Sequence, residues 1–439
     1  MTEQPQPASP LPGAAPVLRV GVLGSGTVGT QVVRLLLEQA DDFAARSGAR
    51  MEITGIAVRD LAVPRALLTD DATAVATGND IVIELIGGIE PARTLILAAL
   101  KSGASVITGN KALIAAHGPE LYDAAAAAGT DFYYEAAVAG AIPVVYALRE
   151  SMAGDRVTSV LGIVNGTTNY ILDEMSTKGL SFEEALATAQ ALGYAEADPT
   201  ADVDGLDAAA KAAILASLSF HTRVGLSDVQ VEGIRSVTAD DIREAHASGC
   251  ELKLLAIAQR REDEHAHGVS VRVHPALVPA DHPLASVHGA YNAVLVEAES
   301  AGRLMFYGQG AGGAPTASAV LSDVVAAAAH RVNGGQAPRE SSYARLPILG
   351  PEAAVTRYQI QLRVEDAAGS LAAMAGVFAD NEVSINSVRQ SAYVTSDGAA
   401  VVTFVTHPAP VFHLDAAVEG LRASDRVMEV VSVRRVEGQ

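Results

Sequence analysis

"VLRVGVLGSGTVG", residues 17 to 29, decides the fold, because it leads from a short apolar strand into a glycine turn, and the helical pattern "TQVVRLLLEQADDFAAR" follows it. Gly24, Gly26 and Gly29 form G-x-G-x-x-G at this strand-to-helix junction. The first two glycines allow a tight turn and a close approach of the backbone to a pyrophosphate, and the third allows helix and strand to pack closely. The stretch therefore predicts dinucleotide binding, against the alternative of a merely structural turn.

The alternation of strand and helix continues after this unit. Apolar runs recur as "MEITGIAV", "IVIELIG", "SVITGN" and "DFYYEAAV", and alanine-rich helical stretches separate them. Strands that alternate with helices at this spacing predict a parallel, doubly wound sheet. We therefore expect an α/β, Rossmann-type dinucleotide-binding domain over residues 17–145, completed by a helix near 315–331.

The carboxyl ends of the later strands predict where a cofactor binds. Small residues in "ELIGG" (84–88) and "TGNKALIAAHG" (108–118) would let a nicotinamide ring lie against backbone, and Lys111 points into the same crevice unless it is simply solvated. Near the end of the second strand Arg59 precedes Asp60, and an arginine suits a 2′-phosphate; NADP is therefore favoured over NAD, although both side chains could be solvated. The residues predicted to contact the cofactor are Gly24, Gly26, Thr27, Val28, Gly29, Arg59, Gly87, Gly88, Lys111 and Gly310.

Beyond the first domain the alternation loosens, and further regions are expected. Helical pieces followed by the apolar runs "VSVRVHPALV", "AYNAVLVEAE" and "GRLMFYGQG" predict an α+β second domain over 146–314. Residues 332–354 carry Pro, Gly and Ser and are typical of a linker. Residues 355–439 show the order βαββαβ of a small ferredoxin-like module. The proline-rich residues 1–16 predict a disordered leader rather than a signal peptide.

Composition excludes several classes of partner. The formal charge of −20 and the lack of any Lys/Arg run argue against nucleic acid. No apolar run reaches the ~18 residues that a bilayer span needs, so a membrane partner is not expected. The single cysteine, Cys250, excludes an internal disulfide and favours a cytoplasmic protein. The histidines form no HExxH pattern, and no G-x-S-x-G is present, so neither a zinc site nor a serine nucleophile is expected.

The most acidic stretch is "AEADPTADVDGLDAAAK", residues 195 to 211. An EF-hand alignment on Asp202 fails, because no oxygen anion stands at the first position and Lys211 replaces the bidentate Glu at the last. Asp207 and Lys211 are four residues apart, so they share one face of an apolar, alanine-rich helix that should be buried. Solvated pairs of this kind are common, but buried charges are expensive unless they are paired or used.

Two further stretches carry candidate polar groups. "GIVNGTTNYIL" (162–172) sets Gly166 and Thr167 in a polar turn, which can cap a helix or line a small pocket. "YYEAAVAGAIPVV" (133–145) places Glu135 at the end of a strand, where one carboxylate with neighbouring carbonyls can hold a hard cation. From the residues alone, a capped strand end is the favoured explanation of Glu135.

Together these motifs resemble the homoserine dehydrogenase family over nearly the whole chain after the leader. The resemblance is carried by "VLGSGTVG", "TGNKALIA", "EAAVAGAIPVV", "GIVNGTTNYIL" and, most specifically, "GYAEADPTADVDGLDAAAKAAILA". The segment "VEDAAGSLAAMAGVFADNEVSINSVRQ" looks like an ACT domain. The resemblance implies NAD(P)-dependent, reversible interconversion of L-homoserine and L-aspartate 4-semialdehyde in threonine, methionine and isoleucine biosynthesis.

The resemblance also implies roles for individual residues. Lys211 and Lys111 correspond to the family's lysines at the reacting centre, and one of them would exchange the hydroxyl proton while hydride moves to the nicotinamide. Substrate binding falls to Glu196, which would hold the ammonium, and to Asp202, Asp207, Thr167 and Gly166. Glu135 with the backbone of Val138, Gly140 and Ile142 corresponds to a monovalent-cation site, with sodium as the expected ion.

The family further implies regulation and assembly. An ACT domain predicts L-threonine as a feedback effector, the second domain is expected to carry dimerisation, and a homodimer or homotetramer follows. Two residues depart from the family's pattern: Gln309 stands where proline is common, and Glu382 stands where a glycine often follows the Asn. The alternative function is a non-catalytic regulatory protein that senses a dinucleotide and an amino acid.

Overall fold

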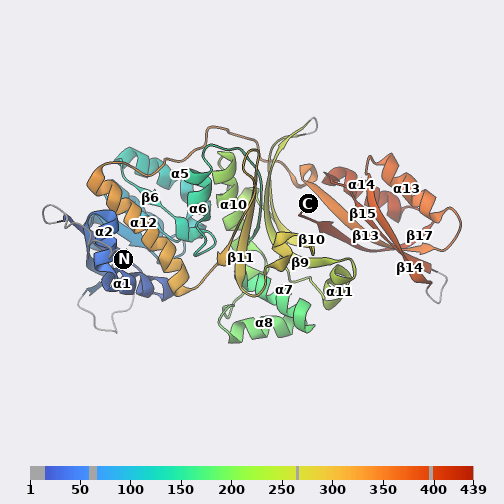
Figure 1. Cartoon of the computed structure of the whole chain (residues 1–439), viewed down its shortest axis with the longest axis horizontal. Helices are drawn as coiled ribbons and strands as arrows, with labels where there is room; N and C mark the ends of the chain where they lie inside the picture. The colour runs from blue at the N-terminus through green and yellow to red at the C-terminus, as the bar shows by residue number, and fades with distance from the viewer. Residues whose placement is uncertain (1–14, 59–66, 264–265, 395–398, 439) are drawn as a thin grey trace, which may run out of the picture. The chain divides into compact units, whose positions relative to one another are not determined.

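The computed structural model describes residues 15–58, 67–263, 266–394 and 399–438. The chain forms two compact units (Figure 1). The first unit takes residues 1–145 and 311–340, and the second takes 146–310 and 341–439. None of the helices in the described ranges is long and apolar enough to cross a membrane.

The first unit is built on a sheet that has six strands in the described ranges, all parallel, in the order β3-β2-β1-β4-β5-β6. β4 and β5 are buried along their whole length, which is expected where helices cover both faces of a parallel sheet. This order confirms the predicted Rossmann-type sheet. The strands are β1 (Val17–Leu23), β2 (Arg50–Ala57), β3 (Leu68–Thr69), β4 (Ile81–Glu84), β5 (Ser105–Thr108) and β6 (Phe132–Tyr133).

Helices pack on both faces of this parallel sheet. α1 packs against α2 and α12 on one face, and α4 packs against α3 and α5 on the other. The late helix α12 thus returns the chain to the first unit. The helices are α1 (Thr27–Glu38), α2 (Ala40–Ser47), α3 (Ala72–Thr77), α4 (Ala92–Lys101), α5 (Lys111–Ala128) and α12 (Gly313–Asn333).

The second unit is built on one mixed sheet with the order β12-β11-β7-β9-β10-β17-β13-β15-β14. Neighbouring strands are antiparallel, except that β17 runs parallel to β10, and β8 also pairs with β10. The strands are β7 (Val157–Ile163), β8 (Gln230–Val231), β9 (Cys250–Glu262), β10 (His267–Pro279), β11 (Tyr291–Ala298), β12 (Gly302–Gln309), β13 (Val355–Glu365), β14 (Ile385–Val394), β15 (Ala399–Thr406), β16 (Ala409–Pro410) and β17 (Val427–Val436).

The helices of the second unit position the candidate site. α7, α10 and α11 all pack on β9, and α10 also packs on β7 and β10. The helices are α7 (Gly166–Lys178), α8 (Phe182–Ala191), α9 (Thr200–Val203), α10 (Leu206–Phe220), α11 (Ala239–Ala247), α13 (Ser370–Asp380) and α14 (Val411–Arg422), while the short α6 (Val144–Tyr146) spans the boundary between residues 145 and 146.

The last part of the chain, residues 355–438, forms what we call the C-terminal module. Its order is β13-α13-β14-β15-α14-β17, with a short β16 before α14, and its antiparallel strands lie in the order β17-β13-β15-β14. α13 and α14 pack together over the sheet (Figure 1), around a core that includes Phe378, Phe404 and Leu414. A single ladder pair, Leu277 with Val436, joins the module's β17 to β10.

Candidate active site

The glycine turn after β1 has the geometry of a dinucleotide cradle. Gly24 is left-handed (φ +100°), and a Cβ there would lie 2.7 Å from Leu85 O. A Cβ on Gly29 would lie 2.2 Å from Gly24 O, so the third glycine lets α1 pack on the turn. A Cβ on Gly26 would meet nothing within 4 Å, and no side chain caps the helix that begins after it at Thr27 and Val28. An anion therefore has room to approach backbone N–H groups here.

The loop after β4 is held by a buried carboxylate that the sequence analysis missed. Glu84 accepts hydrogen bonds from the backbone N–H of Ile86 (2.7 Å) and Gly87 (3.2 Å), and from the hydroxyl of Thr108 on β5 (2.6 Å). Gly87 and Gly88 are left-handed, with open space where a Cβ would stand. In the sequence, Glu84 could have been found because it is an acidic residue at the end of the otherwise apolar strand β4.

The start of α5 places Lys111. Asn110 caps this helix, because its Oδ1 accepts the N–H of Leu113 (3.2 Å) and its Nδ2 donates to Gly88 O (2.6 Å). Lys111 is therefore the first residue of the helix, half-buried, at the same carboxyl edge of the sheet as the glycine turns. Arg59, the predicted 2′-phosphate ligand, lies outside the described residues.

The predicted cation site forms a buried turn in the first unit. Glu135 does not end a strand as expected; the ladder with β5 stops at Tyr133, and Glu135 opens a 3-10 helix. Its Oε1 accepts the N–H of Val145 at 3.0 Å. Ala139 and Gly140 follow in left-handed conformation, each with φ of 56°. The described residues contain no group of three His, Cys, Asp or Glu side chains placed for a metal, so a cation here would depend on backbone carbonyls such as those of Val138 and Ile142.

The acidic stretch and its lysine form a buried polar cluster at the start of α10. Lys211 Nζ donates to Asp207 Oδ2 (2.7 Å) and to Val164 O (2.6 Å), and the two side chains are only 10% and 6% exposed. The pair lies within the first turns of the apolar helix α10, as the spacing predicted. Burial makes this pair costly unless its groups are used or well compensated.

Asn165 ties this pair to a second acid, and the sequence analysis did not assign it a role. Its Nδ2 donates to Asp207 Oδ2 (2.8 Å) and to Asp202 Oδ1 (2.7 Å). Its Oδ1 accepts the N–H of Thr168 (2.8 Å), which caps α7 and fixes the orientation of the amide. Two carboxylates therefore face one lysine and one neutral amide, so the cluster carries an excess negative charge.

The remaining predicted substrate residues lie around this cluster, with one exception. Gly166 and Thr167 open α7 directly after Asn165, and Thr167 Oγ1 donates to Tyr194 O (2.7 Å). Glu196 is exposed on the loop before α9, and its backbone carbonyl accepts from Gln190 (3.1 Å). Among the residues that the structure describes, its carboxylate makes no hydrogen bond or ion pair with the cluster.

At position 310, close packing against a neighbouring side chain requires a glycine. A Cβ there would lie 2.0 Å from the amide of Asn292, which is fully buried on β11, so no other residue fits. The same Asn292 lies 3.4 Å from where a Cβ on Gly166 would stand. At Gly166 the atom that excludes a Cβ is the backbone oxygen of Ala290, which would lie 2.5 Å away.

Comparison with known proteins decides the family. Residues 24–135 match the homoserine dehydrogenase NAD-binding domain, and residues 143–325 match the homoserine dehydrogenase family itself. The homoserine dehydrogenase of Corynebacterium glutamicum is 54% identical over 436 residues, which cover 97% of this chain and 97% of that protein. The chain belongs to the homoserine dehydrogenase family. Its function is accordingly that of an oxidoreductase of this family, rather than that of a non-catalytic sensor.

Solved homoserine dehydrogenase structures agree with this family and fold. One from Thiobacillus denitrificans is 39% identical, with a TM-score of 0.87, and the match covers 96% of this chain and 98% of that one. A mutant of a hyperthermophilic archaeal homoserine dehydrogenase in complex with NADPH is 26% identical, with a TM-score of 0.61; it covers 71% of this chain and 97% of that one.

Proposed function

We propose that the chain interconverts L-homoserine and L-aspartate 4-semialdehyde at the cluster around Lys211. The observation that carries this proposal is the amine of Lys211, buried and held by Asp207 and Val164 O while Asn165 links Asp207 to Asp202. A positioned amine can exchange a proton, and the surplus carboxylate favours a positively charged substrate group.

In this proposal the two lysines transfer the hydroxyl proton of the substrate. When bound, the nicotinamide accepts hydride from the carbon that carries the homoserine hydroxyl. Lys211 in its neutral form takes the hydroxyl proton, and in the reverse direction its ammonium returns a proton to the aldehyde oxygen. Lys111, at the start of α5, shares this role or stabilises the developing charge on the oxygen.

Substrate recognition follows from the excess negative charge. Asp202, Asp207 and Glu196 attract the substrate ammonium, while Thr167 and the backbone of Gly166 contact its polar groups. Glu196 is exposed, so its contribution requires the loop before α9 to close over the substrate. Replacing Glu196 by Gln should therefore raise the KM for homoserine more than it lowers kcat; an unchanged KM removes it from the ammonium site.

The cofactor in this proposal is NADP or NAD, with NADP preferred. The open space above Gly26, Gly87 and Gly88 and the uncapped start of α1 suit a dinucleotide, and Arg59 supplies the positive charge for a 2′-phosphate. The archaeal relative bound to NADPH supports the same choice. The oxygen donors of Glu135, Val138, Gly140 and Ile142 suit a hard monovalent cation, which we propose to be sodium.

The C-terminal module is proposed to be a regulatory ACT domain that responds to L-threonine. Its βαββαβ order and its antiparallel sheet support this assignment. The proposed layout is a dinucleotide-binding domain (17–145, completed by α12), a catalytic and dimerisation domain (146–314), a linker (332–354) and the ACT domain (355–439). A cytoplasmic homodimer or homotetramer serving threonine, methionine and isoleucine synthesis completes the proposal.

One assay tests the reaction directly. NADPH absorbance is followed with L-aspartate 4-semialdehyde as substrate, and a loss of absorbance that depends on the semialdehyde is expected. A rate no higher than the blank would reject the proposed reaction. Repeating the kinetics with NAD and NADP, and with and without L-threonine, tests the cofactor preference and the regulation separately.

A further inference from the structure

A fully buried carboxylate lies under the loop that follows β4. Glu84 is the last residue of that strand and is 0% exposed. Its Oε1 accepts the N–H groups of Ile86 (2.7 Å) and Gly87 (3.2 Å), and its Oε2 accepts the hydroxyl of Thr108 (2.6 Å). The Thr108 hydroxyl itself accepts the N–H of Asn110 (3.0 Å), so its hydrogen points at Glu84. All three partners of Glu84 are donors, which is the pattern of an ionised carboxylate.

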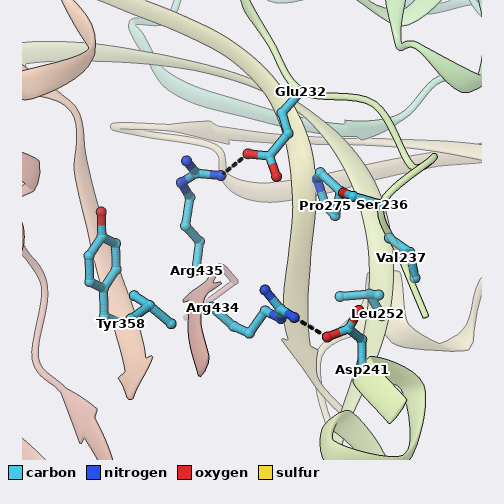
Figure 2. Close-up of a pocket in the computed structure, with 10 residues that line it drawn as sticks. Glu232, Ser236, Val237, Asp241, Leu252, Pro275, Tyr358, Arg434 and Arg435 are labelled. Carbon is cyan, nitrogen blue, oxygen red and sulfur yellow. Dashed lines mark hydrogen bonds and ion pairs between the residues drawn. The ribbon is translucent and has the colours of Figure 1, made fainter. Parts of the chain in front are cut away.

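The charge of Glu84 is not cancelled by a cation. At the border of the C-terminal module, carboxylates pair with arginines, as Glu232 does with Arg435 at 2.6 Å (Figure 2). Among the residues that the structure describes, Glu84 forms no ion pair, and its partners are two backbone N–H groups and one hydroxyl. Such dipoles stabilise a buried anion but leave its net charge in place. The loop after β4 is therefore held by one uncompensated negative charge.

This loop borders the place predicted for the cofactor. A Cβ on Gly24, in the glycine turn after β1, would lie 2.7 Å from the carbonyl oxygen of Leu85, so the turn and the loop touch. Gly87 and Gly88 are left-handed, and a Cβ on either would meet nothing within 4 Å. A dinucleotide whose pyrophosphate lies at the turn can therefore place its nicotinamide against this loop. Glu84, which holds the backbone of the loop, would then lie close to the ring.

The two redox forms of a nicotinamide differ in charge. The oxidised ring is a cation and the reduced ring is neutral, so a nearby negative charge stabilises only the oxidised form. Lys111 begins α5 at the same edge of the sheet and is half-buried, and an ammonium there disfavours a cationic ring. The charge of Glu84 opposes this effect of Lys111.

We propose that the buried charge of Glu84 sets the preference of the cofactor site for the oxidised nicotinamide. Glu84 is a positioning residue in this role, because it acts through the loop that it holds and does not touch the reacting atoms. The inference rests on the proposed use of NADP or NAD. During reduction of the semialdehyde, hydride leaves the reduced ring for the aldehyde carbon, and a charge that stabilises the resulting cation favours this direction.

Equilibrium binding of NADP⁺ and NADPH to the full chain, measured by calorimetric titration without substrate, tests the proposal. Glu84→Gln removes the charge but keeps the shape of the side chain, and its Oε1 can still accept both N–H groups of the loop. We expect the ratio Kd(NADP⁺)/Kd(NADPH) to rise by about 3-fold or more, because loss of the charge weakens the oxidised form selectively. If wild type binds NADH more tightly than NADPH, NAD⁺ and NADH replace this pair.

Asp131→Asn is the matched control. Asp131 is also buried, at 3% exposure, and accepts a backbone N–H, that of Ala337 (2.6 Å). It precedes β6 and so lies at the amino edge of the parallel sheet, away from the glycine turns. Removing its charge should leave the ratio as in wild type. Thr108→Val is a second test variant: it keeps the charge of Glu84 but removes a donor that disperses it, so the ratio should fall.

The outcomes separate the charge effect from the proposed cofactor. If Glu84→Gln weakens both forms equally, or changes neither Kd, Glu84 only holds the loop and the proposal is wrong. A ratio that does not fall in Thr108→Val contradicts it as well, and this variant decides the question if Glu84→Gln fails to fold. If the wild-type chain binds neither form of either dinucleotide, the proposed use of the cofactor fails together with this inference.

Discussion

Two buried ion pairs in the second unit differ in how they are built. Lys211 and Asp207 are four residues apart in α10, with side chains 10% and 6% exposed. Arg272 and Glu437, at 5% and 6% exposed and 2.9 Å apart, come from β10 and from the residue after β17. The first pair is set by helix geometry alone, while the second exists only because the C-terminal module docks.

The charge around each pair also differs. Asp202 and Asn165 extend the first pair into a cluster with a surplus carboxylate. In the second, Glu437 also accepts from the hydroxyl of Thr356 (2.9 Å), and the positive charge of Arg272 balances it. A cluster with surplus charge suits a charged substrate, whereas a balanced one mainly contributes to the specificity and stability of the fold. Breaking each pair should therefore affect different properties.

The largest expected effect is on stability, from Glu437→Ala. Removing this carboxylate leaves Arg272 buried and uncompensated, which should lower the free energy of unfolding by about 3 kcal/mol. Urea denaturation measures it, and turnover at saturating substrate should be unchanged. Glu429→Ala is the control, because Glu429 lies on β17, the strand that ends just before Glu437, and forms an exposed pair with Arg363. A loss no larger than that of the control would show that the Arg272 pair is not structural.

The next largest effect is on turnover, from Lys211→Ala. Loss of the proposed proton-transfer group should lower kcat by at least about 100-fold. Lys178→Ala is the control, because Lys178 forms the same i,i+4 pair with Glu174 but is 60% exposed; its kcat should match wild type. Steady-state kinetics of both variants provide the comparison, and wild-type turnover in Lys211→Ala would exclude the proposed role.

A smaller effect is expected on substrate affinity, from Asn165→Asp. An aspartate can still cap α7 through the N–H of Thr168, so stability should be kept. It cannot donate to Asp202 and Asp207, and it adds a third carboxylate, so the geometry that receives the substrate ammonium is lost. We expect the KM for homoserine to rise about 10-fold. Unchanged KM values with lowered stability would assign Asn165 to capping alone.

The smallest expected effect is on stability, from Glu382→Gly in the C-terminal module, at a position remote from both buried ion pairs. Glu382 is left-handed (φ +58°) and follows α13 in a Schellman arrangement, in which Val383 N–H donates to Phe378 O and Glu382 N–H to Ala379 O. Glycine adopts this conformation without strain, so Glu382→Gly should stabilise the chain by about 1 kcal/mol. Thermal denaturation measures the shift, and a destabilised variant would contradict the strain at Glu382.

Patterns in short, continuous stretches of sequence predicted much of the fold. The glycine turn and the apolar runs after it gave the parallel sheet, and the spacing of Asp207 and Lys211 placed them on one helix face. β7 and β9 were not anticipated, although they are as buried as β10 and β11, whose apolar runs the sequence did indicate.

The functional residues that the sequence analysis missed were overlooked for a different reason. Glu84 and Asn165 act through partners that are distant in sequence, Thr108 on the next strand and Asp202 beyond α8, and no local pattern indicates such contacts. Glu437 reaches Arg272 and His274, which lie together on β10, only after the module has docked. Local patterns therefore predicted the pairing of Asp207 with Lys211 on one helix face, while the groups that orient this pair needed three-dimensional positions.

The ladder pair of Leu277 with Val436 has a consequence for how this chain could have been assembled. Around that pair, the backbone bond from Glu437 N–H to Leu277 O is one main-chain link between strands that otherwise belong to separate sheets. Each such bond contributes on the order of 1 kcal/mol, so little main-chain hydrogen bonding would be lost if the module were absent. Gene fusion or deletion at this border would therefore add or remove the C-terminal module with little change to the strands that support α10 and Lys211.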